Sequence, residues 1–218
     1  MKRASCTAPL PLSSVLLTID VRDDFTKSGA PARIPGTSQR VPAMKEIIQA
    51  YRARKLPIVH VVRLYSADGK NADLCRRERI EAGAKMVVPG TPGAERVDDL
   101  KPTAGSTLDA DRLLAGKLQK LGRHEWAIYK PRWDAFFGTT LEAHLRREGV
   151  DTVVLVGCNF PNCPRGTAYG ASMRDFRVMV VSDAVSGAYP RGLAELERIG
   201  IEVVGKQKCL DWVPKPSV

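Results

Sequence analysis

The sequence has no run of about eighteen apolar residues, which argues against a membrane-spanning helix. Aromatic residues make up only 6% of the chain, and no predicted helix carries a basic stripe interleaved with aromatics. A nucleic-acid partner would rest on the net charge of +10 alone, so we do not expect one. The five cysteines are an odd number without the spacing of a disulfide framework, which indicates reduced thiols and a cytoplasmic location.

Sequence patterns for metals and phosphates are also missing. Cys158 and Cys163 are not accompanied by a His-x-x-His pair or a second pair of cysteines, as zinc sites usually require. Neither G-x-G-x-x-G nor G-x-x-x-x-G-K-[ST] occurs, so the usual phosphate-binding loops are absent. We therefore expect no metal and no cofactor.

Apolar segments that read as strands alternate with segments of helical periodicity. This alternation predicts a single α/β domain of three layers, in which helices cover both faces of a mainly parallel, Rossmann-like sheet of five or six strands. The domain is expected to span residues 15–204, between an N-terminal extension, 1–14, and a polar C-terminal tail, 205–218. The expected strands are residues 15–19, 56–62, 126–129, 153–156, 177–181 and 201–204.

The segment 65–105 is the least regular part of the chain, with frequent glycine, proline and charged residues. Helical periodicity within it is brief, at residues 72–83. A long insertion in a compact α/β domain is typically a binding loop or a lid. We expect this segment to cover the site or to reach a neighbouring subunit.

Cys163 follows the most apolar predicted strand, 153–156, at the corner where a helix beginning near Pro164 is expected. Free backbone N–H groups and the positive end of the helix dipole at such a corner would lower the pKa of a thiol and favour the nucleophilic thiolate. The same N–H groups could bind a developing oxyanion. Cys163 could instead be a buried structural thiol, because free cysteine is among the most buried residue types.

Two charged residues stand at the carboxyl ends of other predicted strands. Asp20 directly follows residues 15–19, and Lys130 follows residues 126–129. The carboxyl ends of parallel strands lie along one edge of a sheet, where ligands bind in open α/β folds. Asp20 could accept a proton there, and Lys130 could stabilise a neighbouring negative charge. Each alone could be a turn or surface residue, but together with Cys163 they predict a nucleophilic site.

Three motifs resemble those of the isochorismatase-like cysteine hydrolases, a superfamily that includes nicotinamidase, N-carbamoylsarcosine amidohydrolase and ureidoacrylate amidohydrolase. Residues 19–25, Ile-Asp-Val-Arg-Asp-Asp-Phe, are similar to the family's D-x-Q-x-D-F. Tyr129-Lys130 and the stretch from Gly157 to Thr167, similar to G-x-x-x-x-x-C-x-x-x-T, also match. The resemblance covers nearly all of residues 15–204.

The resemblance implies a catalytic triad in which Cys163 is the nucleophile, Asp20 the base and Lys130 the residue that balances their charge. It also implies an oxyanion hole formed by the backbone N–H groups of Asn159 and Cys163, and a cis peptide bond between Cys158 and Asn159. The expected reaction is hydrolysis of a C–N bond in a small amide, ureido or lactam compound through a thioester. A homo-oligomer, dimer or tetramer, is expected on the same grounds.

We expect the substrate pocket to be lined mainly by aromatic side chains from the segments around these motifs. The residues are Phe25, Trp133, Phe136, Phe137, Asn159 and Phe160.

The sequence departs from the family pattern around the cysteine, which Pro161 and Pro164 flank, and at two further places. Arg22 stands where the family has Gln, and residues 61–70 contain no histidine that could match the metal-binding D-x-H…H of nicotinamidases. The absence of this histidine predicts a site without metal and disfavours nicotinamide as the substrate. A non-catalytic binding module on the same fold, for a small molecule or a protein, remains the alternative.

Overall fold

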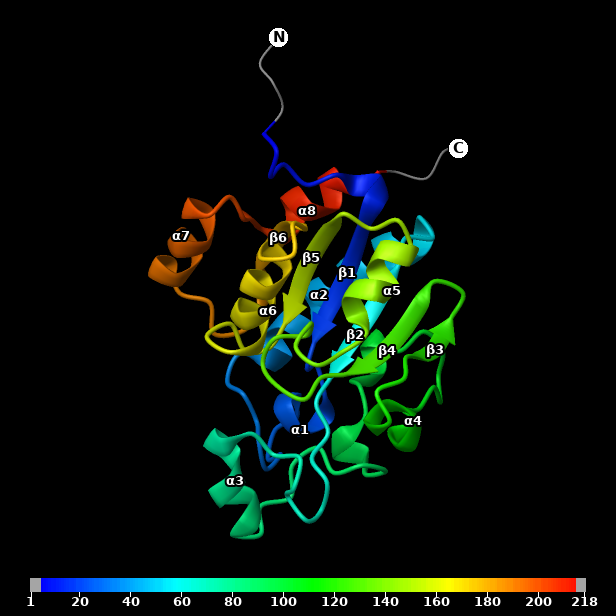
Figure 1. Ribbon diagram of the computed structural model, residues 1–218, viewed down its shortest axis with the longest axis vertical. Coiled ribbons are helices and arrows are strands. Elements are labelled where there is room, and N and C mark those ends of the chain that lie inside the picture. The colour runs from blue at the N-terminus through cyan, green and yellow to red at the C-terminus, as the bar shows by residue number, and fades with distance from the viewer. Residues whose placement is uncertain (1–4, 215–218) are drawn as a thin grey trace.

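The computed structural model describes residues 5–214, which contain a seven-stranded sheet with the order β3-β4-β2-β1-β5-β6-β7 (Figure 1). All neighbouring strands are parallel except β3 and β4. The predicted single α/β domain with a mainly parallel sheet is confirmed. The strands are β1 (Ser14–Ile19), β2 (Ile58–Val62), β3 (Gln119–Gly122), β4 (Glu125–Tyr129), β5 (Thr152–Gly157), β6 (Arg177–Val185) and β7 (Glu202–Val204).

The expected number of strands, five or six, was too low because β3 was missed. This edge strand reads Gln-Lys-Leu-Gly and is partly exposed along its length. Its antiparallel hydrogen bonds to β4 define it as a strand. Four residues with a single large apolar side chain carry no periodicity that sequence analysis could detect.

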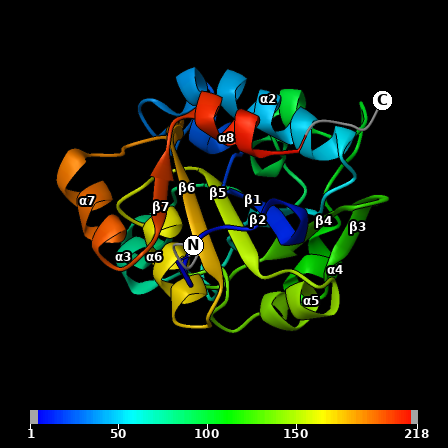
Figure 2. The same ribbon diagram turned by 90° about the horizontal axis from the view of Figure 1, so that it is seen from above.

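Helices cover both faces of the sheet, so the fold has three layers (Figure 2). In this view α2 and α8 lie along one face, and α5, α6 and α7 along the other. The helices are α1 (Asp23–Thr26), α2 (Thr37–Ala53), α3 (Leu74–Glu81), α4 (Ala110–Leu114), α5 (Leu141–Arg147), α6 (Cys163–Ser172), α7 (Pro190–Arg198) and α8 (Lys206–Trp212).

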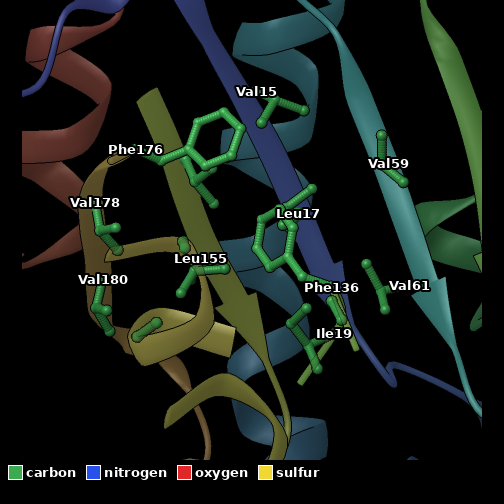
Figure 3. Packing of buried hydrophobic residues seen from close by; sticks show 14 of the residues in the cluster. Val15, Leu17, Ile19, Val59, Val61, Phe136, Leu155, Phe176, Val178 and Val180 are labelled. Carbon is green, nitrogen blue, oxygen red and sulfur yellow. The ribbon is translucent and has the colours of Figure 1, made fainter. Parts of the chain in front are cut away.

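Side chains along the central strands point alternately to the two faces of the sheet, so the apolar core consists of a cluster on each face. In β1, Leu17 and Ile19 belong to the apolar cluster under α5, α6 and α7, which Figure 3 shows from close by. Leu16, the residue before Leu17, points to the opposite face and packs in the cluster beneath α2 with Met44 and Ile48. Successive side chains of a strand point to opposite faces, so an uninterrupted apolar run identifies a strand buried on both sides.

The segment expected as a polar tail, 205–218, contains a further helix. Residues 206–212 form α8, and Cys209 is fully buried against the cluster beneath α2. The helix was missed because it is short and mostly polar, with few residues turned toward the core. Residues 1–4 of the predicted N-terminal extension and 215–218 of the tail lie outside the described residues.

Within residues 5–214, no helix combines the length and the apolar composition that crossing a bilayer would require.

The carboxyl ends of four strands meet at one edge of the sheet. The backbone N–H of Asp20 donates to Val61 O and that of Lys130 to Val62 O, each at 2.9 Å. Cys158 N donates to Ile19 O, also at 2.9 Å. These bonds hold the residues that follow β1, β2, β4 and β5 side by side. In Figure 1 the arrowheads of these four strands point to this edge, and α1 and α3 lie beyond it.

Gly157 is the tightest point of this edge, and replacing it with alanine should strongly destabilise the fold. Its φ is +126°, and an added Cβ would lie 2.2 Å from the carbonyl oxygen of Ile19. We expect Gly157→Ala to lower the free energy of unfolding by about 3 kcal/mol or more, measured by urea denaturation.

Gly149→Ala is the matched control, because Gly149 also has a positive φ, +72°, but nothing lies within 4 Å of the added Cβ. It should cost only about 1 kcal/mol. Equal losses in the two variants would contradict this assignment of a close backbone approach.

Candidate active site

Three side chains from distant parts of the chain converge at the carboxyl edge of the sheet. Lys130 Nζ lies 2.7 Å from Asp20 Oδ2 and donates a hydrogen bond to Cys163 Sγ at 3.2 Å. Asp20 follows β1, Lys130 follows β4, and Cys163 is the first residue of α6. The sequence therefore placed all three at the correct positions of the fold, and the structure brings them into direct contact.

All three groups are almost removed from solvent, with exposed fractions of 3% for Asp20, 1% for Lys130 and 8% for Cys163. Asp20 has a left-handed backbone, φ +54°, a conformation that Asp tolerates better than most residues. Its Oδ2 is bound to Lys130, whereas Oδ1 is buried and has no hydrogen-bond partner among residues 5–214. One carboxylate oxygen is thus available as a proton acceptor.

Burial is the largest influence on the pKa of the Cys163 thiol. Desolvation raises the pKa of Cys163 to about 12, although Lys130 opposes this shift and Asp20 adds to it. Burial also acts on Lys130, but Asp20 and Cys163 outweigh it and raise the pKa of the ammonium above its usual value. The expectation of a lowered thiol pKa is therefore wrong for the resting protein, which holds a neutral thiol beside an ammonium–carboxylate pair.

The backbone at the start of α6 offers two free donors. Neither the N–H of Asn159 nor that of Cys163 has a hydrogen-bond partner within residues 5–214. Asn162 N, in contrast, donates to Asn159 O at 3.1 Å, which closes the turn between them. The peptide bond between Cys158 and Asn159 is cis, as the family resemblance implies.

The three groups line a small, partly open cavity, which we call the thiol chamber. Its volume is about 10 Å³, room for about one water molecule. Charged groups and aromatic rings share its wall. The residues that line it are Asp20, Phe25, Arg63, Tyr65, Asp73, Arg76, Lys130, Trp133 and Cys163.

A clamp of hydrogen bonds fixes α3 over the chamber. Arg63, which directly follows β2, donates from Nη1 to Lys130 O at 2.9 Å and from Nη2 to Asp73 Oδ2 at 2.7 Å. Tyr65 Oη also donates to Asp73 Oδ2, at 3.1 Å. Asp73 is the residue before α3, and its carbonyl accepts from Arg76 N at 3.0 Å. The part of the irregular segment 65–105 that covers the chamber is thus the short helix α3, which hydrogen bonds connect to the strand ends.

The five aromatic residues predicted to line the substrate pocket fall into three groups. Phe25 and Trp133 line the thiol chamber. Phe137 is exposed and borders, with Trp133, an apolar groove beside the chamber. Phe136 and Phe160 are buried in the core cluster, and this corrects their assignment.

Phe136 stacks on Phe176, and Phe160 packs edge-on against Tyr189. An apolar ring near a motif is equally compatible with core packing, so sequence alone did not separate the two cases. Asn159 is half-buried. Its backbone N–H, rather than its side chain, is the donor expected in the oxyanion hole.

Sequence analysis missed four residues of the chamber: Arg63, Tyr65, Asp73 and Arg76. Arg63 had a detectable signal, because it follows β2 as Asp20 follows β1 and Lys130 follows β4. The other three belong to the irregular segment 65–105, where no periodicity predicts which side chains turn toward the sheet edge.

Two other polar groups near the site have structural roles. His60 bonds through Nδ1 to Thr18 Oγ1 and through Nε2 to Glu125 Oε1, each at 2.7 Å, so it belongs to a satisfied network inside the sheet. Arg22, which replaces the family's Gln, is fully buried and donates to Arg63 O at 3.2 Å. Burial lowers the pKa of Arg22 to about 10. It supports the clamp and does not line the chamber.

Within residues 5–214, no cluster of three or more His, Cys, Asp or Glu side chains is arranged to hold a metal ion.

The chain is similar to known proteins over most of its length. The Isochorismatase domain model matches residues 14–197. A probable inactive nicotinamidase from Arabidopsis thaliana is 29% identical, over 87% of this chain and 91% of the relative. The maleamate amidohydrolase of Pseudomonas putida is 30% identical, over 89% of this chain and 84% of the relative.

Among solved structures, an isochorismatase family protein from Desulfovibrio vulgaris superposes with a TM-score of 0.77 at 34% identity, covering 91% of this chain and 97% of the other. The family model covers most of the sequence, and the fold is shared over nearly its whole length. The chain therefore belongs to the isochorismatase family, as its motifs predicted, and its named relatives include hydrolases of amides.

Proposed function

We propose that this protein is a cysteine-dependent hydrolase that cleaves a C–N bond of a small amide, ureido or lactam substrate through a thioester. The observation that carries the proposal is the direct contact of the Cys163 thiol with a buried Lys130–Asp20 ion pair. A neutral thiol becomes a nucleophile when a neighbouring base takes its proton as it attacks. Asp20, with one unpartnered carboxylate oxygen, is the base that the site offers.

In the first step, the sulfur of Cys163 forms a bond to the carbonyl carbon while its proton passes to Asp20. The carbonyl oxygen becomes an oxyanion, for which the N–H groups of Asn159 and Cys163 are the available donors. The C–N bond then breaks, and ammonia or an amine leaves with the proton held by Asp20. A thioester remains on Cys163.

In the second step, water attacks the thioester carbon and gives a proton to Asp20, and the carbon–sulfur bond breaks. The carboxylic or carbamic acid leaves, and the proton returns from Asp20 to sulfur. Lys130 keeps its charge throughout, because it is paired with Asp20 at rest and also bonds to the sulfur. An ammonium that contacts both groups stabilises the negative charge wherever the proton lies.

The relatives support amides as the substrate class. Maleamate amidohydrolase, ureidoacrylate amidohydrolase and N-carbamoylsarcosine amidase are named for the hydrolysis of small amide or carbamoyl compounds. This chain covers most of each of these relatives, from 60% to 84% of their lengths. A small carbonyl group is also the kind of substrate part that a narrow thiol chamber can receive.

The similarity to a probable inactive nicotinamidase favours one alternative, a binding module that keeps the fold but does not catalyse. The two functions differ in what the thiol does, since a binding module does not need a proton acceptor next to sulfur. The same variants test both.

Replacing Cys163 with alanine should abolish turnover, because Cys163 is the thiol that contacts Lys130 and lines the chamber, whereas the sulfur of Cys158 bonds to the backbone carbonyl of Asp20. The measurement is ammonia release across a panel of small amides and carbamoyl compounds. Asp20→Asn should lower kcat by about 10²–10⁴-fold, the usual contribution of a general base. Cys6→Ala removes an exposed thiol outside the chamber wall and should leave the rate unchanged.

Circular dichroism should show that the Cys163→Ala protein remains folded, so that a lost rate reflects lost chemistry. Ammonia release by Cys163→Ala at the wild-type rate would disprove the proposal. Binding of an amide with no turnover in the wild-type protein would favour the binding module.

The reactivity of the free thiol should keep rising with pH across the neutral and mildly alkaline range. Burial holds the pKa of Cys163 at about 12, so the thiolate fraction increases about tenfold per pH unit below that value. The measurement is the rate of iodoacetamide modification of the Cys163 peptide between about pH 7 and 9. A rate that levels off below pH 8 would mean that the resting site holds a thiolate instead.

A further inference from the structure

The wall of the thiol chamber carries one excess positive charge. Of its lining residues, Arg63, Arg76 and Lys130 are cations, whereas Asp20 and Asp73 are the two carboxylates. Lys130 pairs with Asp20 at 2.7 Å, and Arg63 pairs with Asp73 at 2.7 Å. These two close pairs leave Arg76 as the cation without a close partner.

The guanidinium of Arg76 makes no hydrogen bond to any described residue. Its nearest carboxylate oxygen is Asp73 Oδ1, at 3.9 Å from Nε, which is too far for a hydrogen bond. Asp73 is already occupied, because its two oxygens accept from Arg63, Tyr65 and Cys75. An ion pair with Asp73 therefore does not explain why the Arg76 side chain lines the chamber.

Arg76 is also held in place and largely shielded from water. It belongs to α3, which the Arg63–Asp73 clamp ties to the strand ends, and 26% of its side chain is exposed. Burial lowers the pKa of Arg76, but Tyr65, Asp73, Cys163 and Asp20 outweigh it, with a net rise. The guanidinium of Arg76 is thus close enough to Asp20 and Cys163 to interact with them electrostatically.

We propose that Arg76 binds a carboxylate of the substrate, so that the substrates are short amides or ureido compounds with an anionic group a few bonds from the scissile carbonyl. This inference rests on the proposed function. A planar guanidinium with free donors binds carboxylates in a two-pronged geometry. Because Arg76 and Cys163 line the same small chamber, the acid and the carbonyl must be near one another in the substrate.

The first test compares two alkylating reagents of similar size at Cys163, the anionic iodoacetate and the neutral iodoacetamide. Both attack the same thiolate, so the ratio of their rates cancels the thiolate fraction and reports the charge near the sulfur. Peptide mapping by mass spectrometry separates Cys163 from the other thiols. In the wild-type protein, the iodoacetate-to-iodoacetamide ratio should be higher at Cys163 than at the exposed Cys6.

Arg76→Met should lower this ratio at Cys163 by about tenfold or more, the usual loss for a hydrogen bond between charged groups. Arg76→Lys, which keeps the charge, should retain part of it. Arg79→Gln is the matched control, since Arg79 is an exposed arginine of α3 that lies outside the chamber wall, and it should leave the ratio unchanged. An unchanged ratio in Arg76→Met would overturn the proposal.

The second test compares succinamate with butanamide, a pair in which a carboxylate replaces a methyl group. For the wild-type enzyme, kcat/KM should be higher for succinamate. Arg76→Met should raise KM for succinamate by about tenfold or more and leave kcat, and both constants for butanamide, nearly unchanged.

The two proposals fail in different ways. Equal losses on both amides in Arg76→Met would show that Arg76 has only a structural role, and the hydrolase would stand. Turnover of either amide that survives in Cys163→Ala would instead remove the proposed function.

Discussion

The site depends on the buried ion pair between Asp20 and Lys130. Two charges held almost free of solvent are costly to desolvate, and each is tolerated only because the other lies at 2.7 Å. The pair also acts on the thiol, because Lys130 lowers the pKa of Cys163 and Asp20 raises it, whereas burial is the largest influence. Cys163 therefore lies against an ammonium that is already paired with the carboxylate.

The sheet provides the geometry that this pair requires. Backbone bonds from Asp20 to Val61 and from Lys130 to Val62 fix the ends of β1 and β4 on either side of β2. Arg63, at the end of β2, then ties these ends to α3 through Asp73. The bonds that position Lys130 therefore also position α3. This helix carries Arg76, the residue that we propose binds the substrate.

The positions of Asp20, Lys130 and Cys163 could be predicted because strand ends in a parallel sheet obey a simple rule. The segment 65–105 obeys no such rule, so Asp73 and Arg76 became visible only in three dimensions. The thiol pKa was misjudged for a related reason. Sequence shows that Cys163 begins a helix, but it does not show how deeply neighbouring segments bury it. Missing α8 and β3 reflects their short, polar sequences.

The most direct measurement of the central claim is the mass of the Cys163 peptide from enzyme quenched in acid during turnover of a small amide. The account predicts a peptide heavier by the acyl group of the substrate, formed as ammonia is released and absent in Asp20→Asn. Ammonia release at the full rate, with the Cys163 peptide unmodified at every time point, would contradict it.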